Sequence, residues 1–351
     1  MSSPIFKSAP GWHDHPIKHL TAKKRNDMAH SYSMNLWAIT CYFNPVGYRR
    51  RLENYRLFRQ RLTVPLVTVE LSFDGKFQLS EEDADILVQI QGGDVMWQKE
   101  RLLNIALKWV PKNCDKIAWL DCDVVFGSDD WVERASQALG EFPLLHLFHE
   151  RHDPPANVGL DQLCSWNGPP TCRSALHEMA TGGATPEDLL LGGSPPRSTR
   201  GLAWASRREV LEGHGFYDAC ILGSGDNAML CAAFGKFEYC IRRHLMNARR
   251  EEHYLAWARP YFGSVRGRVG YILGRIFHLW HGELIDRQYG QRHQSLEAFD
   301  FDPFTDIALD SNGCWRWSSD KRDLHAFVRR YFESRNEDGI ASEDLPRQPR
   351  L

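Results

Sequence analysis

Long apolar runs are missing from this sequence. No stretch reaches the roughly eighteen consecutive apolar residues that a membrane-spanning helix needs, and the start, Met1 to Pro4, lacks the apolar segment of a signal peptide. The nine cysteines are an odd number without a CxxC pair, which argues against a disulfide framework and a zinc ribbon. We therefore expect a cytoplasmic protein without a membrane span, whose thiols are reduced and mostly buried.

An excess of either charge is also missing. The 351 residues include 43 Lys and Arg and 45 Asp and Glu, which gives a net charge of -2. No global field would therefore draw the molecule to nucleic acid or to an anionic membrane. No internal repeat is visible. The composition, 42% hydrophobic and 12% aromatic, excludes disorder for most of the chain and suits one large α/β domain with additions, or two modest domains.

Strand-like and helix-like patterns alternate between residues 35 and 127. In chain order they are a strand at 36–43, a helix at 48–62, strands at 66–71 and 86–90, a helix at 99–110 and a strand at 116–120. The strands are short apolar runs, and the helices repeat apolar residues every three or four positions. This order predicts an α/β fold with a doubly wound, mostly parallel sheet flanked by helices, whose ligands bind beyond the carboxyl ends of the strands.

Composition divides the rest of the chain. We expect a flexible N-terminal arm at 1–34, two halves of the domain at 35–127 and 128–282, a C-terminal extension at 283–335 and a disordered tail at 336–351. Within the second half, residues 150–200 are rich in Pro, Gly and Ser. They predict a loop-rich insert of the kind that forms lids or binding loops.

Two acids two residues apart, Asp121 and Asp123, directly follow the apolar strand at 116–120. At the carboxyl end of a strand, both side chains can turn toward one cation, or one can hold a cation while the other accepts a sugar hydroxyl. Carboxylate oxygens suit Mg²⁺ or Mn²⁺, which keep coordination positions open for substrate phosphate oxygens. The alternative is an ordinary solvated turn.

Residues 97–107, followed by 117–126, resemble the core of the GT-A fold glycosyltransferases. The nearest pattern is that of the β-1,4-galactosyltransferases and their bacterial and viral family 2-like relatives, which carry a basic residue and Leu-Leu-Asn on the helix before an Asp-x-Asp strand end. Downstream, residues 201–211 resemble the family's acceptor-side strand and helix. Residues 215–218 and 223–227 resemble its Gly-Phe segment and its Trp-Gly-Gly-Glu-Asp helix start.

This resemblance covers most of residues 35 to 282 and implies a function. A nucleoside diphosphate sugar, most simply a UDP-sugar, would bind over residues 35–127 in a metal-dependent way. An acceptor hydroxyl would bind in the half at 128–282. The acceptor is open between a glycan, a small molecule and a nucleic acid.

Asp226 is the only carboxylate in the segment 223–227, where the family usually has two acids. The resemblance therefore implies that Asp226 is the general base, which takes the proton from the acceptor hydroxyl in an inverting displacement. The alternative is that Asp226 caps the helix that begins near Asn227, since Asp is a preferred cap residue.

His278 and His281 end an apolar, strand-like run at 271–280. A neutral imidazole is a fair ligand for Mn²⁺, and the resemblance implies that a histidine from a late strand completes the metal shell. The predicted metal ligands are thus Asp121, Asp123, His278 and His281, with Mn²⁺ or Mg²⁺ as the ion. The alternative is that these histidines are ordinary core residues.

The resemblance also places donor-binding residues at the ends of the first strands and on the helix before the Asp-x-Asp turn. They are Phe43, Asn44, Arg49, Glu70, Gly93, Asp94, Arg101 and Asp121. Gly92 and Lys99 are adjacent candidates. Glycine allows close approach of the backbone to a ligand, although Gly92 and Gly93 also suit a plain turn, and Arg101 a solvated helix face.

Basic clusters at 242–244, 249–250 and 266–268 lie between Asp226 and the two histidines. They suit a mobile loop that closes over phosphate, or a phosphate-bearing acceptor, but also ordinary exposed loops. Two other functions compete with glycosyl transfer. A metal-dependent nucleotidyltransferase uses paired carboxylates on a similar sheet, and a catalytically silent module would keep the fold without the reaction.

Overall fold

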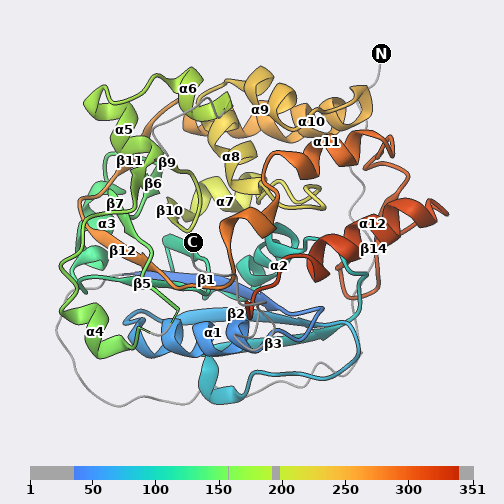
Figure 1. Ribbon diagram of the computed structural model, residues 1–351. Coiled ribbons are helices and arrows are strands. Elements are labelled where there is room, and N and C mark those ends of the chain that lie inside the picture. Colours follow the sequence, from blue (N-terminus) through green and yellow to red (C-terminus); the bar gives the residue numbers. More distant parts are fainter. Residues whose placement is uncertain (1–34, 157, 192–197, 340–351) are drawn as a thin grey trace, which may run out of the picture.

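A seven-stranded sheet forms the centre of the computed structural model, which describes residues 35–156, 158–191 and 198–339 (Figure 1). The predicted arm at 1–34 and residues 340–351 of the predicted tail lie outside these residues. In spatial order the strands are β11 (Val269–Tyr271), β6 (Leu144–His146), β10 (Ala203–Arg207), β4 (Lys116–Leu120), β1 (Leu36–Phe43), β2 (Leu66–Ser72) and β3 (Ile86–Gln91).

Most of this sheet is parallel. Strands β4, β1, β2 and β3 run parallel to one another, β11 is parallel to β6, and only β10 is antiparallel to its two neighbours. The four strands predicted from apolar runs form this parallel part, because strands covered on both faces are apolar along their whole length. In β2, for example, every residue is buried. The predicted α/β fold with a mostly parallel, helix-flanked sheet is confirmed.

Helices cover both faces of the sheet (Figure 1). One face carries α1 (Arg49–Arg61) and α3 (Trp131–Ala138), whose Phe58 and Trp131 pack in one buried cluster with Ala38 of β1. The other face carries α2 (Lys99–Ala106), α7 (Arg208–His214), α8 (Gly225–Ala233), α9 (Phe237–Arg243) and α10 (Ala248–Val265). Ile39 of β1 belongs to the cluster on this second face. The alternation of Ala38 and Ile39 follows from the two-residue period of a strand.

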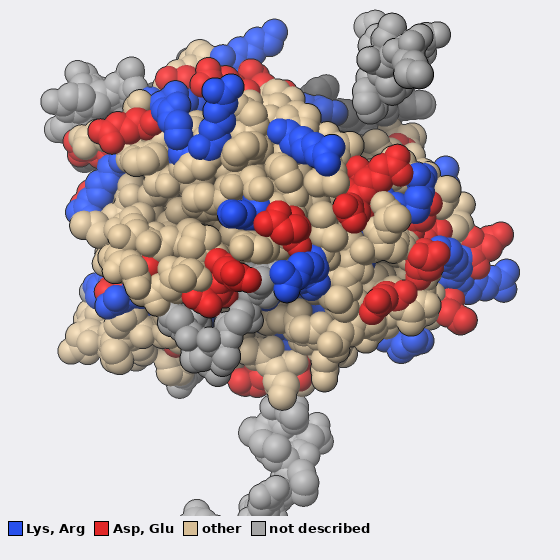
Figure 2. Space-filling model, turned by 90° about the horizontal axis from the view of Figure 1, so that it is seen from above, with Lys and Arg blue, Asp and Glu red and all other residues tan. Residues whose placement is uncertain are grey.

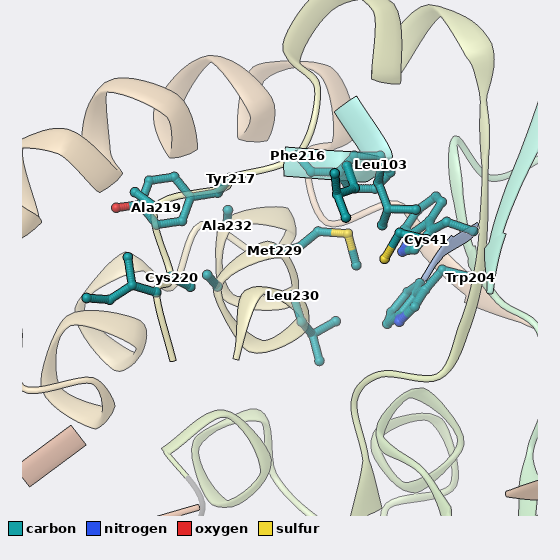
Figure 3. Close-up of a cluster of buried hydrophobic side chains, with 14 of the residues drawn as sticks. Cys41, Leu103, Trp204, Phe216, Tyr217, Ala219, Cys220, Met229, Leu230 and Ala232 are labelled. Carbon is teal, nitrogen blue, oxygen red and sulfur yellow. The ribbon is translucent and has the colours of Figure 1, made fainter. Parts of the chain in front are cut away.

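Aromatic and sulfur-containing side chains fill the core around α8. Met229 of α8, Trp204 of β10 and Cys41 of β1 belong to one buried cluster (Figure 3). The eight cysteines with described side chains are all unpaired, and six of them are buried. Burial raises the pKa of the Cys41 thiol well above its usual range, so this thiol stays protonated and acts as a small apolar residue.

The predicted loop-rich insert at 150–200 contains more regular structure than its composition suggests. It supplies three strands of a second, five-stranded sheet, whose order is β5 (Val124–Phe126), β12 (Arg275–His278), β7 (Glu150–His152), β8 (Cys172–Ser174) and β9 (Ser198–Thr199). It also forms α4 (Leu160–Cys164), α5 (Ala175–Thr181) and α6 (Pro186–Leu191). These elements span two to seven residues, too few to establish a period in the sequence.

The predicted strand at 271–280 is divided between the two sheets. Strand β11 ends at Tyr271 in the first sheet, and β12 begins at Arg275 in the second. Strand β12 pairs with β5, so that His278 lies opposite Val124. This pairing brings His278 and His281 next to the turn that follows β4.

The C-terminal extension contacts the ends of β1 and β3, where the ring of Phe332 packs against Phe43 and the side-chain amide of Asn312 donates to the carbonyl of Gln91. It consists of η3 (Leu284–Arg287), α11 (Gln291–Glu297), the hairpin β13 (Ile307–Leu309) and β14 (Trp315–Trp317), and α12 (Arg322–Glu333). Shorter 3₁₀ turns are η1 (Glu81–Asp83) and η2 (Leu107–Trp109), the second of which ends the predicted helix at 99–110.

Charges are mixed on the surface. On the face seen in Figure 2, acidic and basic side chains are interspersed, and neither sign forms a continuous cover. Within the described ranges, none of the helices is both long and apolar enough to pass through a lipid bilayer.

Candidate active site

The turn between β4 and β5 holds Asp121 and Asp123 in fixed positions. The backbone N–H of Asp121 donates to the carbonyl of Leu202 over 2.8 Å, and the carbonyl of Asp123 accepts from the N–H of Leu279 over 2.8 Å. The turn is thus tied to the strands on both sides of it. Its two carboxylates contact different partners, which makes two adjacent clusters.

The first cluster contains Asp123, His278 and His281. Nε2 of His281 lies 3.0 Å from Oδ2 of Asp123, and Nε2 of His278 lies 4.0 Å from Oδ1. The two Nε2 atoms are 3.2 Å apart. One ligand atom from each of these residues lies within 4.8 Å of the other two, which is a geometry able to hold a metal ion. Asp121, predicted as a further ligand, is not part of this group.

Asp123 is poorly satisfied by the protein alone. Its Oδ1 atom is buried and has no hydrogen-bond partner, which is costly for a carboxylate. Burial opposes ionisation, but His281, His278 and Arg287 outweigh it and hold the pKa of Asp123 well below its usual range. The cluster therefore offers a charged carboxylate with an unused oxygen beside two imidazole nitrogens.

The second cluster joins Asp121 and Asp226 through Lys99. Nζ of Lys99 lies 2.6 Å from Oδ1 of Asp121 and 3.0 Å from Oδ2 of Asp226. Burial would lower the pKa of Lys99, yet Asp121 and Asp226 raise it well above its usual range. Burial raises the pKa of Asp121 to about 6, against the opposing effect of Lys99. Lys99 thus acts as a charged link between the end of β4 and helix α8.

Asp226 does not cap helix α8. The N-cap position is Ser224, with a φ of 79° and no side-chain cap bond, and Asp226 lies inside the first turn with its side chain on Lys99. Gly201 makes room for it, because a Cβ at residue 201 would lie 2.6 Å from Oδ2 of Asp226. The capping alternative is therefore not what the structure shows.

Glu100 is a further neighbour of Lys99 and Asp226 that no sequence pattern indicates. It is 5% exposed, and a Cβ at Gly225 would lie 2.2 Å from its Oε1 atom. Burial raises the pKa of Glu100 to about 8, with Asp226 adding to the effect and Lys99 opposing it. Glu100, Lys99 and Asp226 line a cavity of about 10 Å³, which is close to the smallest space that holds one water molecule. At neutral pH Glu100 is largely a neutral acid.

Three predicted donor-binding residues surround the ends of β1 and β2. Phe43 packs edge-on against Trp97 at a centroid distance of 5.7 Å. Asn44 accepts from the N–H of Tyr48 over 2.9 Å. Glu70 is buried and accepts from the backbone N–H of Gln78 over 2.6 Å, which fixes the segment after β2. All three have structural partners, and their contact with a donor stays a prediction.

The other predicted donor residues are bonded to neighbouring segments. The N–H of Gly93 donates to Asp310 over 2.7 Å, and Asp94 accepts from the N–H of Trp317 over 2.7 Å, so the hairpin β13–β14 lies against them. Arg49 is 78% exposed at its side chain. Arg101 is ion-paired over 3.0 Å with the partly buried carboxylate of Asp218. Their contact with a donor, too, stays a prediction.

Of the three basic clusters, residues 242–243 lie in α9 and residues 249–250 in α10, so these two are helical and not loops, whereas residues 266–268 form the turn that follows α10. Arg250 is buried and donates to the carbonyl of His244 over 3.2 Å. Arg249 is paired with Glu252 and Asp302. Asn247 caps α10 by accepting from the N–H of Arg250, a cap signal that the arginines around it obscured.

Comparison with known proteins gives a distant likeness in fold. No protein-family model matches the chain, and no curated protein matches it. Solved structures that align with it include residues 1–349 of S. aureus TarS in complex with UDP-GlcNAc, at 13% identity and a TM-score of 0.31, over 55% of this chain and 51% of that TarS chain.

Two others align over more of their length. The mannosyltransferase PcManGT of Pyrobaculum calidifontis, in complex with GDP-Man and Mn²⁺, has 13% identity and a TM-score of 0.32, over 91% of this chain and 92% of that one. A putative nucleotide-diphospho-sugar transferase of Desulfovibrio desulfuricans G20 has 12% identity and a TM-score of 0.32, over 85% and 98%. The chain spans about half the length of the TarS chain with which it aligns. At these scores the likeness assigns no activity to this chain.

Proposed function

We propose that this protein is a metal-dependent glycosyltransferase that moves a sugar from a nucleoside diphosphate sugar, most simply a UDP-sugar, to an acceptor hydroxyl with inversion. The observation that supports this most is the division of the Asp-x-Asp pair. Asp123 lies with two histidines, while Asp121 is linked through Lys99 to Asp226. Ion site and base would thus adjoin at the carboxyl end of one strand.

Asp123, His278 and His281 fit a divalent ion. Asp123 has a buried oxygen without a partner, and the two imidazoles bring their Nε2 atoms to within 3.2 Å of each other. Two nitrogens and one carboxylate suit Mn²⁺ better than Mg²⁺, which prefers oxygen ligands. When bound, such an ion neutralises charge that develops on the leaving nucleoside diphosphate.

Asp226 is the proposed general base. Lys99 holds its Oδ2 atom, and its side chain remains 23% exposed, so an acceptor hydroxyl is able to reach it. The carboxylate would accept the hydroxyl proton as that oxygen attacks the anomeric carbon. Asp121 lies on the other side of Lys99 and would accept a hydrogen bond from a hydroxyl of the donor sugar.

A thermal-shift and turnover experiment tests this function. The protein is incubated with Mn²⁺ or Mg²⁺ and a panel of UDP- and GDP-sugars, and its melting temperature and the slow release of free nucleoside diphosphate are measured. We expect stabilisation that requires both the metal and a nucleoside diphosphate sugar, and that is lost in Asp123→Ala. A preference for nucleoside triphosphates would instead indicate a nucleotidyltransferase, and binding without release a silent module. The absence of any metal-dependent stabilisation would overturn the proposal.

A further inference from the structure

Each histidine of the metal cluster meets a second carboxylate through its other ring nitrogen. Nδ1 of His278 lies 3.4 Å from Oδ1 of Asp153, and Nδ1 of His281 lies 3.8 Å from Oε1 of Glu337. Asp123, on the opposite side, faces the Nε2 atoms of both rings. Both imidazoles therefore lie between two acids.

This arrangement bears on where each neutral imidazole carries its proton. Asp123 alone would draw the proton to Nε2, and an N–H there blocks a metal ion. Asp153 and Glu337 draw the proton to Nδ1 and leave Nε2 with a free lone pair. Two such lone pairs and the carboxylate of Asp123 would repel one another unless a cation lies among them.

Asp153 is held in place by its own strand. It directly follows β7, the neighbour of β12 in the second sheet. Nη2 of Arg151 lies 2.7 Å from Oδ2 of Asp153, which leaves Oδ1 to face His278. Oδ1 is buried and has no polar partner besides this ring. The carboxylate is thus anchored at one oxygen and directed at the ring by the other.

Glu337 is held more firmly still. It is 1% exposed and is ion-paired with Arg51 of α1 over 3.0 Å and with Arg335 over 2.6 Å. We call the segment around it, residues 335–338, the C-terminal strap. The predicted disordered tail begins at residue 336, but in the structure the side chains of Arg335 and Glu337 are buried.

The C-terminal strap is tied down on both sides of Glu337. Before it, the N–H of Asn336 donates to the hydroxyl of Tyr48 over 3.0 Å. After it, Asp338 accepts from the N–H of Arg50 over 2.8 Å, at the start of α1. Gly282, the residue after His281, lets the strap approach, because a Cβ there would lie 2.7 Å from the carbonyl oxygen of Asn336.

We propose that Asp153 and Glu337 are the positioning residues of the metal centre and that the C-terminal strap completes this centre. The inference rests on the proposed function, in that Asp123, His278 and His281 are taken as the metal ligands. It adds that the insert and the extreme C-terminal part of the described chain set the orientation and tautomer of those ligands.

The test measures Mn²⁺ affinity, which does not depend on knowing the sugar or the acceptor. The dissociation constant is obtained for the full chain from the electron paramagnetic resonance signal of free Mn²⁺. We expect Asp153→Asn and Glu337→Gln each to weaken binding by about 10- to 100-fold, the usual cost of losing a carboxylate behind a histidine ligand.

Matched controls separate orientation from folding. Glu333→Gln removes an exposed carboxylate from the end of α12, before the strap begins, and Glu150→Gln removes one from β7 that faces His149 and His152. Both should bind Mn²⁺ as the wild type does. Melting temperatures in the presence of a chelator report folding. If Glu337→Gln fails to fold, Asp153→Asn still provides the test. The side chain of Asp153 is 26% exposed, against 1% for Glu337, so its replacement disturbs the interior less.

The outcomes separate the inference from the proposed function. Binding by the wild type and equal binding by Asp153→Asn and Glu337→Gln would overturn the inference and leave the proposed function standing. A wild type that binds no divalent ion would overturn the metal site of the proposed function itself. Weaker binding in both variants, with unchanged controls, supports the inference.

Discussion

Lys99 donates from Nζ to Oδ2 of Asp226 over 3.0 Å. This bond connects the helix before β4 with the first turn of α8, across 127 residues of sequence. Because Lys99 also lies 2.6 Å from Asp121, one ammonium group serves a carboxylate from each half of the domain. Its removal leaves two poorly solvated negative charges.

Lys99→Met should therefore destabilise the protein by about 3 kcal/mol or more, the usual cost of leaving a buried charge without its partner. The free energy of unfolding is measured by urea denaturation. The double variant that combines Lys99→Met with Asp226→Asn should lose less free energy of unfolding than the sum of the losses in the two single variants. The second change removes one of the charges that Lys99→Met leaves unpaired. A Lys99→Met protein within 0.5 kcal/mol of wild type, roughly the effect of an ordinary surface change, would contradict this prediction.

Asp226→Asn should keep donor binding and lose sugar transfer. An amide fills the same space but does not accept the proton, so we expect turnover to fall by about 10²- to 10⁴-fold, the range for loss of a general base. Metal-dependent thermal stabilisation by the donor should be unchanged. Glu238→Gln, which changes an exposed acid on the neighbouring α9, is the control. Turnover that survives in Asp226→Asn would remove the base assignment.

Gly201→Ala should displace the carboxylate of Asp226. The added methyl group would lie 2.6 Å from Oδ2, too close for any real contact. We expect a loss of about 1–3 kcal/mol of stability from this overpacking, together with reduced transfer. Gly213→Ala is the matched control, because a Cβ there meets nothing within 4 Å in helix α7, where alanine is favoured. If both variants behave alike, the close packing of residue 201 on Asp226 has no consequence.

Stability should fall as the pH rises from about 5 to 8, through the titration of Glu100. Its pKa is raised to about 8 in the folded protein from 4.5, so the folded state binds more protons than the unfolded state within this window. The contribution of Glu100 to stability is fully present below pH 4.5, the pKa in the unfolded state. It is lost as the pH rises through about 8, the pKa in the folded protein. Glu100→Gln, a neutral mimic, should flatten this pH dependence.

Urea denaturation without added metal, at several pH values, measures the effect. The wild type and Glu100→Gln should have similar stability at pH 5, and the variant should be the more stable at pH 8. Parallel pH profiles for the two proteins would show that Glu100 does not titrate in this window.

Parts of the site could be predicted because their signals are local. Asp121 and Asp123 stand directly after an apolar strand, and His278 and His281 end another apolar run, so the predicted metal-binding pair and the two histidines were both visible in sequence. His278 and His281 lie close enough to Asp123 to share a cation with it, and their binding of an ion stays a prediction. The role of Asp121 could not be separated from that of Asp123, since the turn that directs them apart depends on Leu202 and Leu279.

By itself, the sequence determined the elements with strong periods. The apolar runs of β1, β2, β3 and β4 are long enough to be recognised, because strands buried on both faces carry apolar residues throughout. The order of these elements and of the helices between them then restricts the chain to a doubly wound sheet.

Only the tertiary structure decided which charges meet. Lys99, Glu100, Asp153 and Glu337 have no local pattern that distinguishes them from solvated acids and bases. Lys99, Asp153 and Glu337 contact Asp226, His278 and His281 from distant parts of the sequence. These contacts depend on strand order and on the short strands of the second sheet, which have no period of their own. The desolvation that raises the pKa of Glu100, and the burial of Glu337 in the C-terminal strap, arise only when those distant segments pack together.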